Sequence, residues 1–493
     1  MFIRAPLAQG RISRPNGHRR RSISGLPIRG SCGALANRSM TLIPRRALLL
    51  PLSLVLAAAA LAADTGAVPL PERVLPGLGP ILSDASRQSP RMLSRAIDLE
   101  IAENNRLAAR SNILPSVGLN FRQVEARDDR ADQPKTLSAS KTYYDASITQ
   151  PLFHWGERRN LARVGEIQQQ IARGNHREAY RGLALEIRHR YLILIAQKRL
   201  VARGRDYVAY TAQQVRLAEE RLAKKVISEM EFFPVRLAAD QAQIGLERAE
   251  FDFASSRAAF GRLVGGAVPA PESIPDDIPE LPYDAALFDR LLAGFLADDI
   301  PASIEAVNLG LVRDIEDLNL RNQRTRLRPK VSLVAGANQD EQSYTLNTAQ
   351  KYKLNSLYAG VTVSWTIFDG FAAQAAVRNS LARLRQLEID RGELAHRLGQ
   401  QAQTQAKQVY FSARAMAIAD RAYVSAQGGL RARQADFARG AVSESDVALA
   451  GIQVHDTRIA AFNARTDFLL RVGEFLGTVG GDPVLAALDD VRR

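Results

Sequence analysis

The chain has 493 residues, of which 46% are hydrophobic and 24% charged, enough for two or three ordinary domains or one elongated one. Its formal net charge of +14 would suit nucleic-acid binding, but ten arginines and no acidic residue lie within residues 1–46. Most of the excess charge is therefore confined to this segment. The rest of the chain is nearly balanced, which excludes a nucleic-acid partner.

An apolar run from Ala47 to Ala63, ALLLPLSLVLAAAALAA, follows the arginine-rich segment. A positive flank, a short apolar core and the small-residue site Ala60-Leu61-Ala62 are typical of a secretory signal peptide. At about 17 residues the run is short for a transmembrane anchor, which is the alternative interpretation. We expect residues 1–62 to be a leader and signal peptide, with Met40 as the start of a conventional signal.

Cys32 is the only cysteine and lies within this leader, so the mature chain offers no disulfide and no thiolate ligand for a metal. No run of 18 apolar residues follows the signal. If the protein crosses a membrane, it must therefore do so as a closed β-barrel, whose backbone groups are all hydrogen-bonded.

The first half of the mature chain is predicted to form a helix, two strands and a long helix with one break. Residues 83–112 have helical spacing, and alternation predicts strands at 117–123 and 143–149, separated by a polar loop at 125–141. Pro151 should close the second strand, because proline cannot donate to the ladder. Residues 157–265 are helical with a break at 224–228, where Ser228 and Glu231 form a capping box. Pro234 predicts a kink or a late start of the returning helix, which is clearly periodic from 237 to 263.

The second half repeats this order after a proline-rich connector at 266–302, which is partly helical at 285–296. Helix is expected at 304–326, strands at 331–336 and 357–366 around a polar loop at 340–353, and helix at 372–439. A break at 440–443 precedes a last helix that ends near 476. Gly440 suits this break because it can adopt a left-handed conformation, and Ser443 can cap the helix that follows.

Matching positions in the two halves are separated by a nearly constant offset. Pro115 corresponds to Pro329, Phe153 to Phe368, and Ser228 to Ser443. The junctions ITQPLFHWGERR at 148–159 and VSWTIFDGFAA at 363–373 also correspond. We therefore predict a tandem duplication, with repeats at 63–302 and 303–480 and a C-terminal tail at 481–493.

Each repeat contributes two strands of about 10 residues, long enough to cross a bilayer at a tilt, with one apolar face. Four strands cannot close a barrel around a lumen, so several chains must share one barrel. The helix at 372–439 would extend about 100 Å at 1.5 Å per residue, which no globular domain requires. Aromatic residues at the strand-to-helix junctions suit a membrane interface: Phe153, Trp155, Trp365, Phe368 and Phe371.

The two junctions carry the motifs QPLFHWG and TIFDG, and the long helices break at Ser228 and Ser443. In these features and in the order of the repeated elements, the chain resembles the TolC-like outer-membrane efflux protein family over residues 83–476. The resemblance implies a mainly α fold with a membrane β-barrel. In it, a homotrimer forms a 12-stranded barrel in outer-membrane lipid, continuing into an α-helical tunnel in the periplasm of a Gram-negative bacterium. It also implies a passive exit duct of a tripartite efflux or type I secretion system. The partners would be a periplasmic adaptor and a proton-driven or ATP-driven inner-membrane pump.

The resemblance assigns roles to the two helix breaks. Adaptor contact is expected at the tips, through Lys224, Lys225, Val226, Ile227, Ser228, Arg439, Gly440, Val442 and Ser443. Asp446 and Glu231 correspond to acidic gate positions of the family. Val442, Leu449 and Phe437 replace the family's charged or tyrosine residues there. We therefore expect a hydrophobic constriction formed by these three residues, with an acidic ring at Asp446 that favours cations. The alternative is that Asp446 only stabilises the helix N-terminus.

No catalytic set is evident. The six histidines are scattered, without a metal-binding spacing, and neither a phosphate-binding lysine loop nor a nucleophile-elbow motif occurs. We expect no enzyme activity, no metal and no cofactor. The competing class is a periplasmic coiled-coil scaffold without a pore. Charge on the face otherwise assigned to lipid would count against the channel, and that face carries none: Tyr144, Ala146, Ile148, Val361, Val363 and Trp365.

Overall fold

The computed structural model describes residues 68–128, 137–297, 303–344 and 351–485. The predicted leader and signal peptide, with Met40 and Cys32, lies outside the described residues. Within the described ranges, none of the helices is both long and apolar enough to span a membrane.

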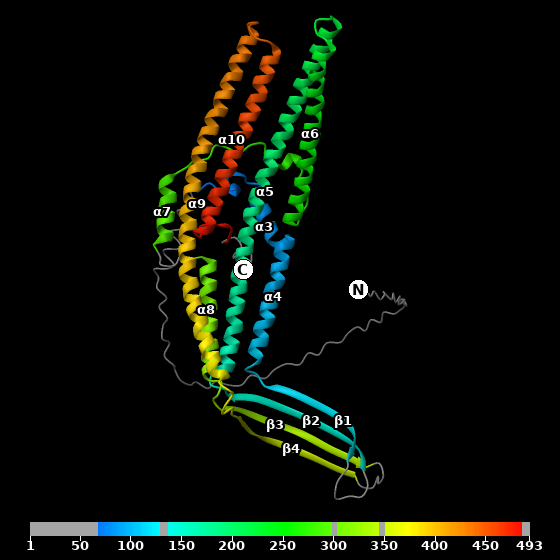
Figure 1. Ribbon diagram of the computed structural model, residues 1–493, viewed down its shortest axis with the longest axis vertical. Helices are drawn as coiled ribbons and strands as arrows, with labels where there is room; N and C mark the ends of the chain where they lie inside the picture. The colour runs from blue at the N-terminus through cyan, green and yellow to red at the C-terminus, as the bar shows by residue number, and fades with distance from the viewer. Residues whose placement is uncertain (1–67, 129–136, 298–302, 345–350, 486–493) are drawn as a thin grey trace, which may run out of the picture. The chain divides into compact units, whose positions relative to one another are not determined.

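The two halves contain the same elements in the same order, as the duplication predicts (Figure 1). Each half has a helix, two strands, a helix of 67 residues and a returning helix. The first comprises α4 (Pro90–Ser111), β1 (Ser116–Asp128), β2 (Leu137–Phe153), α5 (Glu157–Ala223) and α6 (Glu229–Val264). The second comprises α8 (Ile304–Arg324), β3 (Lys330–Tyr344), β4 (Lys351–Ser364), α9 (Ala372–Ala438) and α10 (Glu444–Thr478). Shorter elements are α2 (Pro71–Val74), α3 (Leu78–Gln88), η2 (Pro271–Ser273) and α7 (Ala285–Leu296).

The helix predicted over residues 83–112 is two helices, α3 and α4, which meet at Ser89. The ring of Pro90 forces the preceding residue out of the helical region, and Ser89 has the extended angle ψ 129°. The Ser89 hydroxyl donates to the carbonyl of Leu263 at 2.8 Å, so the break packs on the end of α6. Pro90 then occupies the first turn of α4, where its missing N–H costs nothing.

Pro234 does not delay the returning helix of the first repeat, so the late start is wrong. Helix α6 begins at Glu229, directly after the cap Ser228. Only the hydrogen bond to the carbonyl of Met230 is necessarily lost, because that is the i−4 position of Pro234. The loss falls near the start of the helix, where its effect on the whole is small.

The four strands form one antiparallel sheet in the order β1-β2-β3-β4 (Figure 1). They are longer than predicted, because polar residues at 125–128, 137–141 and 340–344 continue the ladder instead of forming loops. Pro151 does not end β2, since it still pairs with Ser332, and the strand continues to Phe153 through an irregularity in register. Pairing with β1 ends at Thr149, so that side of Pro151 needs no donor.

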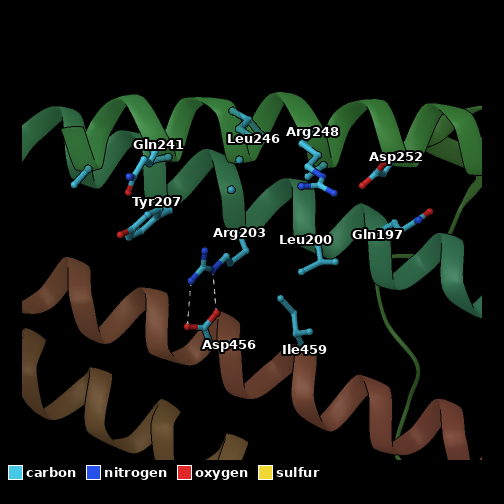
Figure 2. A pocket seen from close by; sticks show the side chains of 15 residues that line it. Gln197, Leu200, Arg203, Tyr207, Gln241, Leu246, Arg248, Asp252, Asp456 and Ile459 are labelled. Carbon is cyan, nitrogen blue, oxygen red and sulfur yellow. Dashed lines mark hydrogen bonds and ion pairs between the residues drawn. The ribbon is translucent and has the colours of Figure 1, made fainter. Parts of the chain in front are cut away.

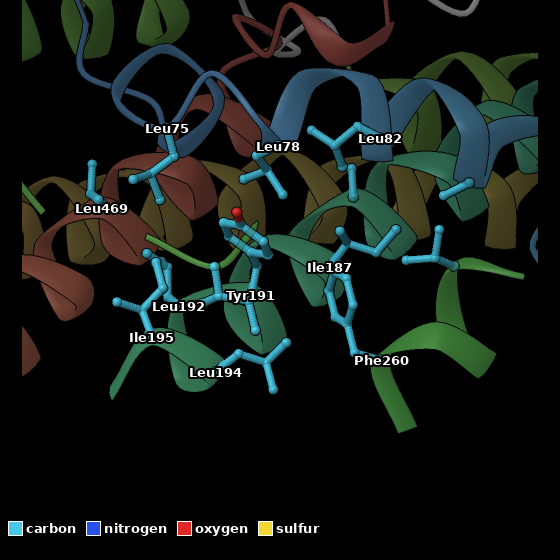
Figure 3. Close-up of a cluster of buried hydrophobic side chains, with 14 of the residues drawn as sticks. Leu75, Leu78, Leu82, Ile187, Tyr191, Leu192, Leu194, Ile195, Phe260 and Leu469 are labelled. Atoms are coloured by element: carbon cyan, nitrogen blue, oxygen red, sulfur yellow. The ribbon is translucent and has the colours of Figure 1, made fainter. Parts of the chain in front are cut away.

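Two hydrophobic clusters hold the helices together. The first joins α3, α5 and α6, and its buried members include Leu78, Leu82, Ile187 and Tyr191 (Figure 3). The ring centroids of Tyr191 and Phe260 are 5.8 Å apart. The second joins α7, α9 and α10, and its largest buried members are phenylalanines: Phe288, Phe295, Phe468 and Phe475. The connector helix α7, as predicted at 285–296, thus belongs to the core of the second repeat.

A buried ion network ties the two ends of the described chain to α5. Arg188 is fully buried and donates to both carboxylate oxygens of Asp482 at 2.8 and 2.9 Å. Its remaining donors reach both oxygens of Glu72 at 2.9 and 2.5 Å. Burial alone would lower the pKa of Arg188, but the hydrogen bonds and charges of Asp482 and Glu72 raise it. The start of the segment predicted as a tail is therefore a fixed part of the fold.

Candidate functional site

The register of the sheet aligns apolar side chains of all four strands on one face. Successive strands pair Val117 with Ile148, Ile148 with Ala335, and Ala335 with Ala359. The next row along the strands contains Leu119, Ala146, Ala337 and Leu357. No layer of the described residues covers these side chains: Leu119 is 79% exposed and Leu357 88%. The strands thus present a continuous apolar face to their surroundings.

Aromatic residues lie at both ends of this face. At one end, the rings of Phe121 and Tyr144 are 5.0 Å apart. At the other, Phe153 contacts Trp155 at 4.7 Å. Beyond Phe121 and Tyr144 the face becomes polar, with residues such as Gln123 and Thr142. The apolar residues therefore form a band with an aromatic border at each end.

The opposite face of the sheet carries small and polar side chains. Asn120, Asp145, Asn338 and Ser356 form one row across the four strands. Tyr358 lies across Gly336, where an added Cβ would come within 2.6 Å of its hydroxyl oxygen. The Tyr358 hydroxyl donates to Asp145 at 3.3 Å. This face suits contact with water.

Both strand-to-helix junctions turn through two consecutive left-handed residues. They are Trp155 and Gly156 in the first repeat, and Gly370 and Phe371 in the second. The indole N–H of Trp155 donates to the Pro329 carbonyl at 2.8 Å. That of Trp365 donates to the Leu327 carbonyl at 2.9 Å. In the second junction, Phe368 and Phe371 pack edge to face at 5.3 Å. All five predicted interface aromatics are exposed at these junctions.

The helix tips have the same backbone motif in both repeats. Lys225 and Gly440 take the left-handed conformation, with φ 57° and 74°. The residue after each donates back to the helix, Val226 to Arg221 and Ala441 to Asp436, at 2.8 and 2.9 Å. This Schellman arrangement satisfies carbonyls that the helix ends leave free. The expectation for Gly440 is confirmed, whereas the strained Lys225 was not anticipated.

Substituting Lys225 with glycine should stabilise the first tip by about 1 kcal/mol, because a side chain in the left-handed conformation costs about 1–2 kcal/mol. Hydrogen exchange of the amides around residues 221–228 would measure the change as slower local opening. Gly440→Ala is the matched variant in the second repeat and should speed opening by a similar factor. Equal exchange in Lys225→Gly and the parent chain would contradict the strain at Lys225.

The predicted gate acids close capping boxes. Glu231 accepts from the backbone N–H and hydroxyl of Ser228 at 2.8 and 2.9 Å, and Asp446 accepts likewise from Ser443 at 3.0 and 2.7 Å. Backbone and side-chain hydrogen bonds from Ser228 lower the pKa of Glu231. Side-chain and backbone hydrogen bonds from Ser443 lower the pKa of Asp446. Both carboxylates are thus ionised at neutral pH and serve at least as caps, the alternative considered for Asp446.

The other predicted tip and gate residues are distributed over the exposed ends of the hairpins. Leu449 and Phe437 are about half exposed, and Val226 is 68% exposed. Arg439, which caps the end of α9, pairs with Asp436 of that helix at 2.5 Å. Lys224 and Ser228 are exposed, while Ile227 and Val442 are half-buried.

Polar contacts connect the helical hairpin of the first repeat with that of the second. Arg203 of α5 pairs with Asp456 of α10 at 2.9 Å beside a groove of about 550 Å³ between α5, α6 and α10 (Figure 2). Further along the same helices, Asp206 contacts His455 at 2.9 Å, and Gln214 donates to Ser445 at 2.7 Å. Within the described ranges, no group of three or more His, Cys, Asp or Glu side chains could hold a metal ion.

Comparison with known proteins gives one family and a set of solved structures. The family described as Outer membrane efflux protein matches residues 81–266. No curated protein sequence matches the chain. The CmeC outer membrane channel of Campylobacter jejuni is 12% identical, covering 82% of this chain and 85% of that one, with a TM-score of 0.63. The outer membrane protein VceC of Vibrio cholerae is 15% identical, covering 83% and 98%, with a TM-score of 0.58. The MtrE outer membrane channel of Neisseria gonorrhoeae is 14% identical, covering 82% and 89%, with a TM-score of 0.57.

The matched residues lie within the first repeat, from α3 to just beyond the end of α6. The solved structures share the fold across both repeats. The resemblance to the TolC-like outer-membrane efflux family is therefore confirmed, as is the mainly α fold with a four-stranded sheet. The family consists of outer-membrane efflux proteins and is not a family of enzymes. This description agrees with the predicted location in the outer membrane.

Proposed function

We propose that this protein of the outer-membrane efflux type is the passive exit duct of a tripartite efflux or type I secretion system. The observation that carries the proposal is the exposed apolar band of the sheet with its aromatic borders. From Tyr144 to Phe153, β2 rises roughly 30 Å at about 3.3 Å per residue. At a tilt of about 40° this gives a height of about 23 Å, close to the apolar band of outer-membrane barrels.

Closure of the sheet supports a homotrimer. Within the described chain, β1 pairs only with β2, and β4 only with β3, so each outer strand has one edge without a partner. Open edges are not tolerated in lipid, and four strands are too few to surround a lumen. Three copies would join β1 of one chain to β4 of the next and give 12 strands. The polar face with Asn120, Asp145 and Asn338 would then line the water-filled interior.

The helix tips are the proposed docking and gating region. A periplasmic adaptor that links the duct to an inner-membrane pump would contact residues 224–228 of the first tip and Arg439, Gly440, Val442 and Ser443 of the second. Val442, Leu449 and Phe437 would narrow the entrance, with Asp446 and Glu231 as acidic groups. Three copies of an ionised Asp446 around one axis would attract cations.

Asp446→Asn should reduce the cation preference of single channels, because it removes three negative charges from the proposed ring. The reversal potential in a salt gradient measures this preference. Glu444→Gln is the matched control, since Glu444 is an acid of the same helix turn outside the capping box. An unchanged reversal potential in Asp446→Asn would leave Asp446 with its capping role alone.

The alternative is a periplasmic scaffold without a pore. Charge on the apolar face would have favoured it, and the rows between the two aromatic borders contain none. The decisive experiment is single-channel conductance of the purified protein in planar bilayers, with its oligomer mass measured in detergent. A trimer with discrete channels is the expected result. A monomer that stays in solution and conducts no current would remove the duct and favour the scaffold.

A further inference from the structure

A basic segment that links the end of α8 to the start of β3 has no role in the duct as described. Residues 321–330, RNQRTRLRPK, contain five cations and no acidic residue. Three of them are paired: Arg321 with Asp317, Arg326 with Asp369, and Lys330 with Glu157, at 2.6, 3.5 and 2.5 Å. For Arg328 the structure gives no carboxylate partner among the described residues, and its side chain is exposed.

The guanidinium of Arg328 is held against an aromatic ring. It lies 4.6 Å from the centroid of Trp155, within the range of a cation–π contact. The two tryptophans of the chain fix the backbone on either side of Arg328, since Trp155 donates to the Pro329 carbonyl and Trp365 to the Leu327 carbonyl. The cation is therefore oriented by the fold and does not depend on a flexible loop.

The position of this cation relative to the apolar band suggests its ligand. Trp155 contacts Phe153, which pairs with Val331 at the end of the band. A group stacked on Trp155 therefore lies where the hydrocarbon of a membrane gives way to headgroups. Phosphate is the anion present at that depth, and a guanidinium can bind two of its oxygens at once. Exposed Phe153 and Trp365 supply apolar surface for the acyl chains of the same molecule.

We propose that Arg328 and Trp155 form a binding site for the phosphate of an anionic phospholipid in the periplasmic leaflet. The proposal rests on the proposed function, because it requires that the sheet lie in the membrane. A lipid is favoured over free phosphate since only a lipid also covers the adjacent aromatic surface. The site would fix the depth and the rotation of the sheet in the bilayer.

Tryptophan fluorescence tests this proposal directly. Trp365→Phe leaves Trp155 as the single tryptophan of the chain. The phenyl ring keeps an apolar surface at position 365, and the hydrogen bond from Trp155 to the Pro329 carbonyl still fixes the backbone next to Arg328. The full-length mature protein is reconstituted in phosphatidylcholine vesicles that contain phosphatidylglycerol, with bromine on the acyl chains of one lipid or the other. Quenching by brominated phosphatidylglycerol should exceed the quenching expected from its share of the lipid by about fivefold, since one cation near an anionic surface contributes about 1 kcal/mol.

Arg328→Gln should reduce this enrichment to the bulk value, and Arg328→Lys should retain part of it. Arg324→Gln is the matched control, an exposed arginine at the end of α8 that does not stack on Trp155, and it should leave the enrichment unchanged. Equal quenching by both lipids in the parent protein would overturn the lipid site. Loss of the enrichment on adding millimolar inorganic phosphate would assign the site to free phosphate instead. No quenching by either brominated lipid would mean that the sheet is outside the bilayer, which is a failure of the proposed function.

Discussion

Replacing Arg188 with methionine should destabilise the protein by about 3–5 kcal/mol per chain, the effect expected when one partner of a buried ion pair is removed. The side chain of Asp482 is 1% exposed and that of Glu72 15% exposed. Both carboxylates would lose their cation while remaining largely out of water. Asp482 would keep a hydrogen bond from the Val484 amide at 3.1 Å, which cannot compensate the charge.

Unfolding followed by circular dichroism in detergent measures this loss. Arg471→Met is the control, because Arg471 pairs with Asp467 and Glu474 on the surface, where such pairs contribute at most about 1 kcal/mol. Adding Asp482→Asn to Arg188→Met should recover part of the stability by removing the more deeply buried charge. If Arg188→Met were no more harmful than Arg471→Met, the network would not stabilise the fold.

This network also marks what the sequence could not reveal. Arg188 is 116 residues from Glu72 and 294 residues from Asp482, and no local pattern connects them. By contrast, the repeat, the long helices and the caps at Ser228 and Ser443 follow from local periodicity and spacing, and all are present. Side-chain alternation also identified the apolar face, because the period of a strand fixes which residues share a side.

The strand ends were misjudged for a physical reason. Near the strand ends the side chains on both faces of the sheet are polar, for example Glu125, Lys141 and Asp340. The hydrophobic periodicity therefore predicts a loop there. Backbone pairing does not depend on side-chain polarity, and the hairpins continue well past the apolar band. The strained Lys225 was missed because lysine is not typical of the left-handed region, although its correspondence with Gly440 was available from the repeat offset.

A lysine introduced on the apolar face should be far more harmful than one on the opposite face. Val361 and Thr362 are neighbours on β4, both exposed, and their side chains point to opposite sides of the sheet. Val361 pairs with Leu333 near the middle of the apolar band. Val361→Lys would place a cation in the hydrocarbon, at a cost of about 2–4 kcal/mol per chain near the midplane. Thr362→Lys would place the same charge in the water-filled interior, where its hydration is retained.

The yield of folded trimer after insertion into lipid vesicles distinguishes the two variants. Because three copies share one barrel in the proposed assembly, the cost in Val361→Lys is incurred three times in each trimer, and we expect little or no folded trimer. Thr362→Lys should assemble like the parent protein while lowering the cation preference of its channel. A periplasmic scaffold would tolerate both variants, since a lysine at an exposed position in water costs little at either residue. Equal yields of folded trimer from both variants would therefore contradict the placement of this face in lipid, even if each single chain keeps its fold.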